Sequence, residues 1–218
     1  MTKGVFITFE GSEGCGKSTQ IEHLARRVRA IGYRARTVRE PGGTPVGEEI
    51  RYTLKHSKSS SAMTPETELL LMNASRAQLV REVIRPALNA GEIVLSDRFY
   101  DSTFAYQGYG RQLDLSLVRA IVDFAVGDTR PELTVLLTVT PEISELRRAM
   151  RQATLPFMRD RIEEADRSFF ERVEKGFAAI AAAEPARFRV LDASGSMESV
   201  AERIWDHVRP VLPKIGRW

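Results

Sequence analysis

The sequence predicts an α/β fold in which a parallel β-sheet lies between two layers of helices. Short apolar runs rich in β-branched residues alternate with longer segments whose apolar residues follow helical spacing. A glycine-rich turn joins the first of these strands to the first helix. Polar residues follow several strand ends, where the ligands of parallel sheets bind. We therefore expect a three-layer domain with a central five-stranded parallel sheet, flanking helices and a short lid.

The first three elements form one unit. An apolar run over residues 4–9 predicts a buried strand, and residues 19–31 carry apolar side chains at helical spacing. Between them lies GSEGCGKS, from Gly11 to Ser18, which fits G-x-x-x-x-G-K-[ST] at every fixed position. A strand before this pattern and a helix after it are the context in which it binds nucleotide phosphates. A glycine-rich turn that binds nothing is the alternative, and it leaves both flanking elements unexplained.

The residues of this loop suit the binding of phosphates. Gly11, Gly14 and Gly16 permit backbone dihedrals that side chains would block, so that successive N–H groups can face one anion. The helix that starts near Lys17 adds its positive end. We expect Lys17 to reach the β- and γ-phosphates and Ser18 to offer its hydroxyl to Mg²⁺. The loop therefore predicts a nucleoside triphosphate, but not the reaction.

The next part of the chain predicts a strand over 34–39, a turn at 40–43, a helix over 46–54 and a polar, serine-rich loop over 55–64. A long helix follows over 65–90, because Pro65 suits the first helical position and Gly91 suits the end. Its apolar residues lie on more than one face. Such a helix either is central to the core or packs on both the sheet and a second subunit.

Alternating strands and helices continue to the C-terminus. The remaining elements that we predict are a strand over 92–95, a helix over 115–126 between a cap at Asp114 and Gly127, a strand over 133–139, a helix from 141, a helix over 167–183, a strand over 188–191 and a helix over 197–208. No internal repeat and no long linker divides the chain. We expect a single domain over 1–218, with a lid region at about 148–163.

Composition narrows the class of protein. The formal charge is +3 and the isoelectric point about 9.2, a mildly basic balance that we do not interpret as nucleic-acid binding. The sequence contains no run of 18 apolar residues, so we expect no membrane span. The first strand begins too early to leave room for a signal peptide. The single cysteine, Cys15, excludes an internal disulfide. We therefore expect a cytoplasmic protein.

Three further strand ends carry polar motifs. Residues 39–44 read REPGGT, and Asp97-Arg98 closes the third strand. An aspartate there can hold Mg²⁺ through water, while an arginine can clamp a phosphate with two hydrogen bonds. Residues 192–195 read DASG and suit a turn. Arginines gather over 147–161, where they suit a flap that brings cations to a transferring phosphoryl group and excludes water.

Several motifs in this order resemble bacterial thymidylate kinases, which are P-loop nucleoside-monophosphate kinases. They are FEGSEGCGKST, REPGGT, SRAQL, DRFYDSTFAYQG, RPELTVLLTV and DRIEE, and they extend from about Val5 to Ala193. The resemblance implies Mg²⁺-dependent transfer of the γ-phosphoryl group of ATP to dTMP, giving dTDP for dTTP synthesis. It also implies a homodimer formed through the 65–90 helix. No nucleic-acid or membrane partner is expected.

The resemblance also assigns roles to single residues. The residues implied for ATP are Gly11, Ser12, Glu13, Gly14, Cys15, Gly16, Lys17, Ser18, Thr19, Arg148 and Ala193, with Arg148 packing on the adenine. Those implied for dTMP are Glu40, Arg51, Met72, Arg76, Arg98, Thr103 and Gln107, with Arg51 and Arg98 on the phosphate and Arg76, Thr103 and Gln107 at the base. Ser18 and Asp97 are implied for Mg²⁺, and Lys17, Glu13, Asp97 and Arg98 for catalysis.

The resemblance implies that family members carry a catalytic arginine either in the phosphate loop or in the lid. The loop of this chain contains no arginine, so the lid should supply the catalytic cation from Arg151, Arg159 or Arg161, among which the sequence does not choose.

One residue departs from the family pattern. Met72 stands where the family usually has a phenylalanine that stacks on the base. Replacing the aromatic stack with a methionine contact costs on the order of 1 kcal/mol. We expect weaker dTMP binding and a more adaptable base pocket.

Other functions remain open from the sequence. One is a kinase for another monophosphate, such as dUMP, CMP or AMP, although Arg76 and Gln107 suit a small pyrimidine edge. A GTPase-like switch would carry an N-K-x-D motif, which is absent. A member that binds nucleotides without turnover would not need Lys17, Ser18, Asp97 and Arg98 together.

Overall fold

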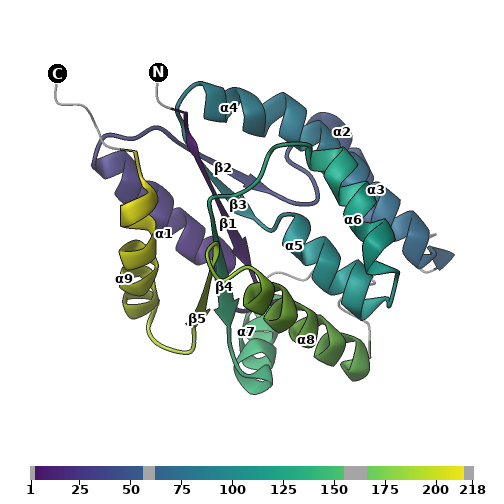
Figure 1. Ribbon diagram of the computed structural model, residues 1–218. Helices are drawn as coiled ribbons and strands as arrows, with labels where there is room; N and C mark the ends of the chain where they lie inside the picture. The colour runs from purple at the N-terminus through teal and green to yellow at the C-terminus, as the bar shows by residue number, and fades with distance from the viewer. Residues whose placement is uncertain (1–2, 56–61, 155–165, 214–218) are drawn as a thin grey trace.

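Five parallel strands form one sheet in the order β2-β3-β1-β4-β5 (Figure 1). The computed structural model describes residues 3–55, 62–154 and 166–213. The strands are β1 (Val5–Glu10), β2 (Ala35–Arg39), β3 (Ile93–Asp97), β4 (Leu133–Thr138) and β5 (Phe188–Asp192). The predicted five-stranded parallel sheet is thus confirmed. The central strand β1 is buried throughout, as its apolar sequence requires.

The register of the sheet brings the strand ends together. Phe9 lies opposite both Asp97 of β3 and Val135 of β4, and Arg39 of β2 also lies opposite Asp97. The carboxyl ends of β1, β2 and β3 therefore meet at one edge. The predicted strand over 92–95 continues to Asp97, so this aspartate is the last residue of β3.

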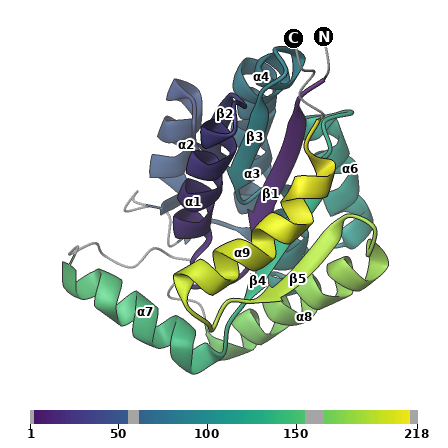
Figure 2. The ribbon, with the colours of Figure 1, turned by 90° about the vertical axis from the view of Figure 1, so that its left-hand side faces the viewer.

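Helices cover both faces of the sheet. Helices α1 (Lys17–Ala30) and α9 (Met197–Val208) pack on one face, where they share a core cluster with β1, β3 and β4. The other face carries α3 (Pro65–Leu79), α6 (Leu115–Val126) and α8 (Arg167–Ala183). Figure 2 shows α1 and α9 together in front of the sheet, with α7 (Pro141–Thr154) extending from one end of it. Helix α2 (Pro45–Lys55) packs beside α3.

The predicted helix over 65–90 is confirmed, but its hydrogen bonding changes near the end. It consists of α3, a π-helical segment η2 (Val80–Ile84) and α4 (Arg85–Asn89). The backbone N–H of Arg85 donates to Val80 O, five residues back. Pro86 has no N–H and its ring crowds the preceding turn, which accounts for the wider turn at this point.

One helical segment was not predicted. Helix α5 (Tyr100–Thr103) continues into a second π-helical segment, η3 (Phe104–Gly110), and every residue of the two except Tyr109 is buried. A helix buried on all sides lacks the periodic apolar face by which helices are recognised. Gly110 lets α8 approach closely, since a Cβ at this position would lie 2.6 Å from the Phe169 ring.

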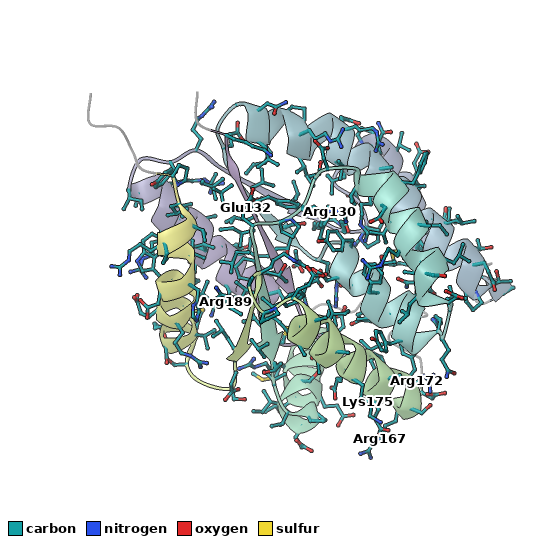
Figure 3. All side chains as sticks on the ribbon, in the orientation of Figure 1. Arg130, Glu132, Arg167, Arg172, Lys175 and Arg189 are labelled. Atoms are coloured by element: carbon teal, nitrogen blue, oxygen red, sulfur yellow. The ribbon has the colours of Figure 1, made fainter. Side chains whose placement is uncertain are left out.

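Helix ends follow the predicted caps elsewhere. Asp114 Oδ1 accepts from the backbone N–H of Ser116 at 2.7 Å, and α6 ends at Gly127 as expected. Among the helices of the described ranges, none has the length and apolar composition needed to cross a membrane. Figure 3 shows Arg167 and Lys175 projecting outward from α8, so part of the excess of basic residues lies on the outer surface of this helix.

Candidate active site

The glycine-rich loop has the backbone that its sequence predicts. Gly11, Gly14 and Gly16 have φ values of 132°, 74° and 94°, a region that side chains disfavour. Lys17 is buried, and its Nζ donates to Gly11 O at 3.1 Å and Ser12 O at 2.9 Å. The ammonium group is therefore held at the loop itself, beside the N-terminus of α1. Thr19 is exposed on the first turn of that helix.

Ser18, on the first turn of α1, meets Asp97, the last residue of β3. Ser18 Oγ donates to Asp97 Oδ2 at 2.6 Å, although 79 residues separate them. A hydroxyl and a carboxylate oxygen are ligands that suit Mg²⁺. Within the described ranges no group of three or more His, Cys, Asp or Glu side chains could hold a metal ion, so phosphate oxygens and water would have to complete the shell. This pair fits the predicted Mg²⁺ site.

A pocket adjoins the loop at the same edge of the sheet. Its lining residues are Glu13, Glu40, Pro41, Lys55, Met72, Arg76, Arg98, Ser102, Thr103, Tyr106 and Gln107. Six of the seven residues that the resemblance implied for dTMP are therefore together. Arg51 is not among them, but its Nη1 donates to the carbonyl oxygen of Pro41, which lines the pocket, at 2.9 Å. Sequence reasoning missed Tyr106, although it belongs to the quoted Y-Q-G motif.

Arg98 lies between the loop and the pocket. Its φ is 70°, an uncommon value for a residue with a side chain, and its guanidinium lines the pocket and reaches Glu13 of the loop. Nη1 donates to Ser102 Oγ at 3.0 Å, while Nη2 donates to Tyr106 Oη at 3.2 Å and Glu13 Oε1 at 3.5 Å. Burial lowers the pKa of Arg98, but Tyr106 and the surrounding carboxylates raise it above its ordinary value. The residue is a fixed cation.

Glu10 is linked to Arg98 through Ser102, and the sequence analysis did not predict this residue. Its Oε1 accepts from the backbone N–H of Phe99 at 2.8 Å, and its Oε2 accepts from Ser102 Oγ at 2.6 Å. Ser102 Oγ in turn accepts from Arg98, so one hydroxyl joins the two charges. Burial, together with the charge of Asp101, raises the pKa of Glu10 from 4.5 to about 7. Its place as the last residue of β1 was the only signal in the sequence.

Arg76 forms a buried ion pair with Glu40. Its Nη2 donates to Glu40 Oε2 at 2.7 Å, and its Nε donates to both carboxylate oxygens. Nη1 donates to Asn73 Oδ1 at 2.7 Å and to Thr103 Oγ1 at 2.9 Å, and Nη2 also reaches Phe99 O at 3.3 Å. All five N–H groups thus point at protein acceptors. The position at the base that the resemblance implies for Arg76 requires that a bond to the base share one of these N–H groups.

The opposite side of the loop faces α7 and the β5–α9 turn. Arg147 Nη2 donates to Ala193 O at 3.0 Å, and its Nη1 lies 3.5 Å from Gly14 O. The predicted adenine contact was Arg148, the next residue, whose side chain lies outside the described part. The predicted lid arginines lie there too, since the side chain of Arg151 and all of 155–165 are not described. Cys15 is buried, with its Sγ 3.6 Å from Lys17 Nζ.

The fold and the site define the class of protein. A parallel sheet, a phosphate-binding loop at the end of β1 and an arginine-lined pocket beside it are the features of a P-loop phosphotransferase.

Comparison with known proteins gives the family. The thymidylate kinase family model matches residues 9–204. Thymidylate kinase of Deinococcus radiodurans is 48% identical over 205 residues, which cover 94% of this chain and 96% of that protein. The Geobacter sulfurreducens enzyme is 45% identical, with 97% and 99% covered. The crystal structure of the Ehrlichia chaffeensis enzyme superposes with a TM-score of 0.75 at 31% identity, covering 95% of this chain and 99% of the other. This chain belongs to the thymidylate kinase family.

The raised pKa of Glu10 predicts a pH-dependent stability. The folded protein binds the proton more tightly than the unfolded chain, so stability falls as the pH rises from about 4.5 to about 7, and the penalty is complete above that range. Urea unfolding measures this. Between pH 5 and pH 8 the free energy of unfolding of wild type should fall by about 2–3 kcal/mol more than that of Glu10→Gln, whose residue 10 cannot ionise. Equal losses in the two proteins would contradict this account.

Proposed function

We propose that this chain transfers the γ-phosphoryl group of ATP to dTMP, giving ADP and dTDP for dTTP synthesis. Membership of the thymidylate kinase family supports the reaction. The observation that carries the proposal is the position of Arg98, which lines the acceptor pocket and hydrogen-bonds to Glu13 of the phosphate loop. A cation at that position lies between a donor held by the loop and an acceptor held in the pocket.

Different residues of the chain bind the donor phosphates, the acceptor phosphate and Mg²⁺ in this proposal. The N–H groups of the loop and Lys17 hold the donor phosphates, and Arg98 holds the acceptor phosphate and its developing charge. Ser18 and Asp97 would hold Mg²⁺, which neutralises charge on the transferring group when bound. Glu13 hydrogen-bonds to Arg98 and so links the orientation of the two substrates. Arg51 reaches the acceptor phosphate from beside Pro41, as the family resemblance implies.

The lid supplies the remaining positive charge in this proposal. The loop offers Gly14 and Cys15 where it could carry an arginine, and Arg151, Arg159 and Arg161 are the candidates for the catalytic cation. Arg148 is the residue proposed to pack on the adenine. Charge of this kind is needed only in the transition state, which suits residues on a closing segment.

A coupled assay of ADP release tests the function. The panel is dTMP, dUMP, dCMP, CMP, UMP, AMP and GMP, each with ATP and Mg²⁺, and Lys17→Met is the control for contaminating kinases. Turnover should be best with dTMP and should fall at least 100-fold in the control. Retained ATP binding without turnover of any monophosphate would sink the proposal and favour a nucleotide-dependent switch.

Met72 gives a prediction about affinity. This half-buried side chain lines the pocket where a ring can stack on the base. Met72→Phe should lower the KM for dTMP about five- to tenfold, because base–aromatic stacking exceeds a methionine contact by on the order of 1 kcal/mol. Initial rates at saturating ATP measure this. An unchanged or higher KM would show that the stacking explanation is wrong.

We also propose that the chain forms a homodimer in the cytoplasm, through the helix over 65–90. On α3 and the adjacent α6, Leu70, Leu117 and Phe124 are exposed, Phe124 to 83%. Exposed apolar side chains on neighbouring helices suit an interface between two copies of the chain.

Light scattering after size-exclusion chromatography tests the dimer. Wild type should be dimeric at micromolar concentration, and Phe124→Glu should be mostly monomeric, because it places a charge in the apolar contact. Leu146→Glu is the matched control, since Leu146 is also exposed but lies on α7. A monomeric wild type, or equal effects of the two substitutions, would refute the interface.

A further inference from the structure

A buried carboxylate touches the amide of Gln107. Gln107, on η3, donates from Nε2 to Glu68 Oε1 of α3 at 2.7 Å, across 39 residues of sequence. Both residues are buried, Glu68 completely. Glu68 lies outside the pocket, whereas Gln107 lines it. Gln107 therefore links Glu68 to the pocket.

Arg111 holds this carboxylate in position. Its Nη2 donates to Glu68 Oε2 at 3.1 Å, and its Nε lies 3.4 Å from Oε1. Its guanidinium also stacks over the Phe169 ring, 4.5 Å from the centroid. Both oxygens of Glu68 thus accept hydrogen bonds. A carboxylate paired with a guanidinium accepts hydrogen bonds, and the amide of Gln107 accordingly turns its NH₂ group toward Glu68.

This orientation leaves Gln107 Oε1 for the pocket. Among the residues that the structure describes, no donor is bonded to that oxygen. It is also not enclosed, since Gln20 Oε1 is the one fully buried polar side-chain atom without a partner in the same ranges. The pocket therefore presents an acceptor, and not a donor, at this position.

We propose that Glu68, held by Arg111, is a positioning residue that makes the pocket select a base with a ring N–H. This inference rests on the proposed function. Thymine and uracil carry a donor at N3, which Gln107 Oε1 can accept. Cytosine carries an acceptor lone pair at N3, so two acceptors would face each other in a buried site. A site built to hydrogen-bond one group rejects an analogue that lacks it.

The discriminating variant is Glu68→Gln. A glutamine at 68 can donate as well as accept, so the amide of Gln107 is free to turn and offer NH₂ to cytosine. The ratio of kcat/KM for dTMP to that for dCMP should fall at least about tenfold, the effect of one mispaired hydrogen bond. The ratio for dTMP to dUMP should stay within about twofold, because these bases differ only in the 5-methyl group. Each ratio comes from one preparation, so the folded fraction cancels.

Controls separate this proposal from the function itself. Glu66→Gln removes an exposed carboxylate from the same helix and should leave both ratios unchanged. A wild type that fails to phosphorylate dTMP would refute the proposed function before any variant is made. A wild type active on dTMP, with an unchanged dTMP:dCMP ratio in folded Glu68→Gln, would refute the role of Glu68.

A measurement on wild type covers the case in which Glu68→Gln does not fold. N3-methyl-dTMP carries no donor at N3, and it should inhibit dTMP phosphorylation with an inhibition constant at least about tenfold above the KM for dTMP. An inhibition constant equal to that KM would overturn the proposal, because the oxygen of Gln107 would then not be reading N3.

Discussion

The parallel pairing of β1 with β3 is the constraint on which the site depends. It sets Phe9 opposite Asp97, so that the residues following these two positions meet at one edge of the sheet. The phosphate loop leaves β1 there, and the chain after Asp97 turns through Arg98 in a left-handed conformation. A slip of one residue in β3 would turn Asp97 away from Ser18. Register thus fixes the metal pair and the acceptor arginine together.

Buried ion pairs then fix side chains at the pocket and in the layer around it. Glu40 pairs with Arg76, Glu68 with Arg111, and Asp101 with Arg187 at 2.7 Å. Such pairs add little net stability, because desolvating both charges offsets most of their attraction. Their value lies in geometry. A side chain locked by a charged neighbour is already oriented when the ligand arrives, which reduces the entropy lost on binding.

The sequence predicted what depends on local patterns. Helices α6, α8 and α9 begin and end as predicted, since their caps and periodic apolar faces are local signals. Helix α5 and η3 were missed because burial on all sides removes the pattern. In the site, the phosphate loop and most of the pocket residues were predicted through their motifs. Glu10, Glu68 and Arg111 were not, since their roles arise from contacts with residues distant in sequence.

The hydrogen bonds that Arg76 already makes within the protein affect how the base can be bound. Its five N–H groups already have protein acceptors, one of them Thr103 Oγ1, so it shapes the pocket first and reads the base second. Recognition then depends more on Gln107 Oε1, an acceptor without a bonded donor in the described structure. A pocket that identifies its base through one oriented acceptor has less need of an aromatic stack for selectivity. Met72 can therefore weaken affinity while selectivity for a ring N–H persists.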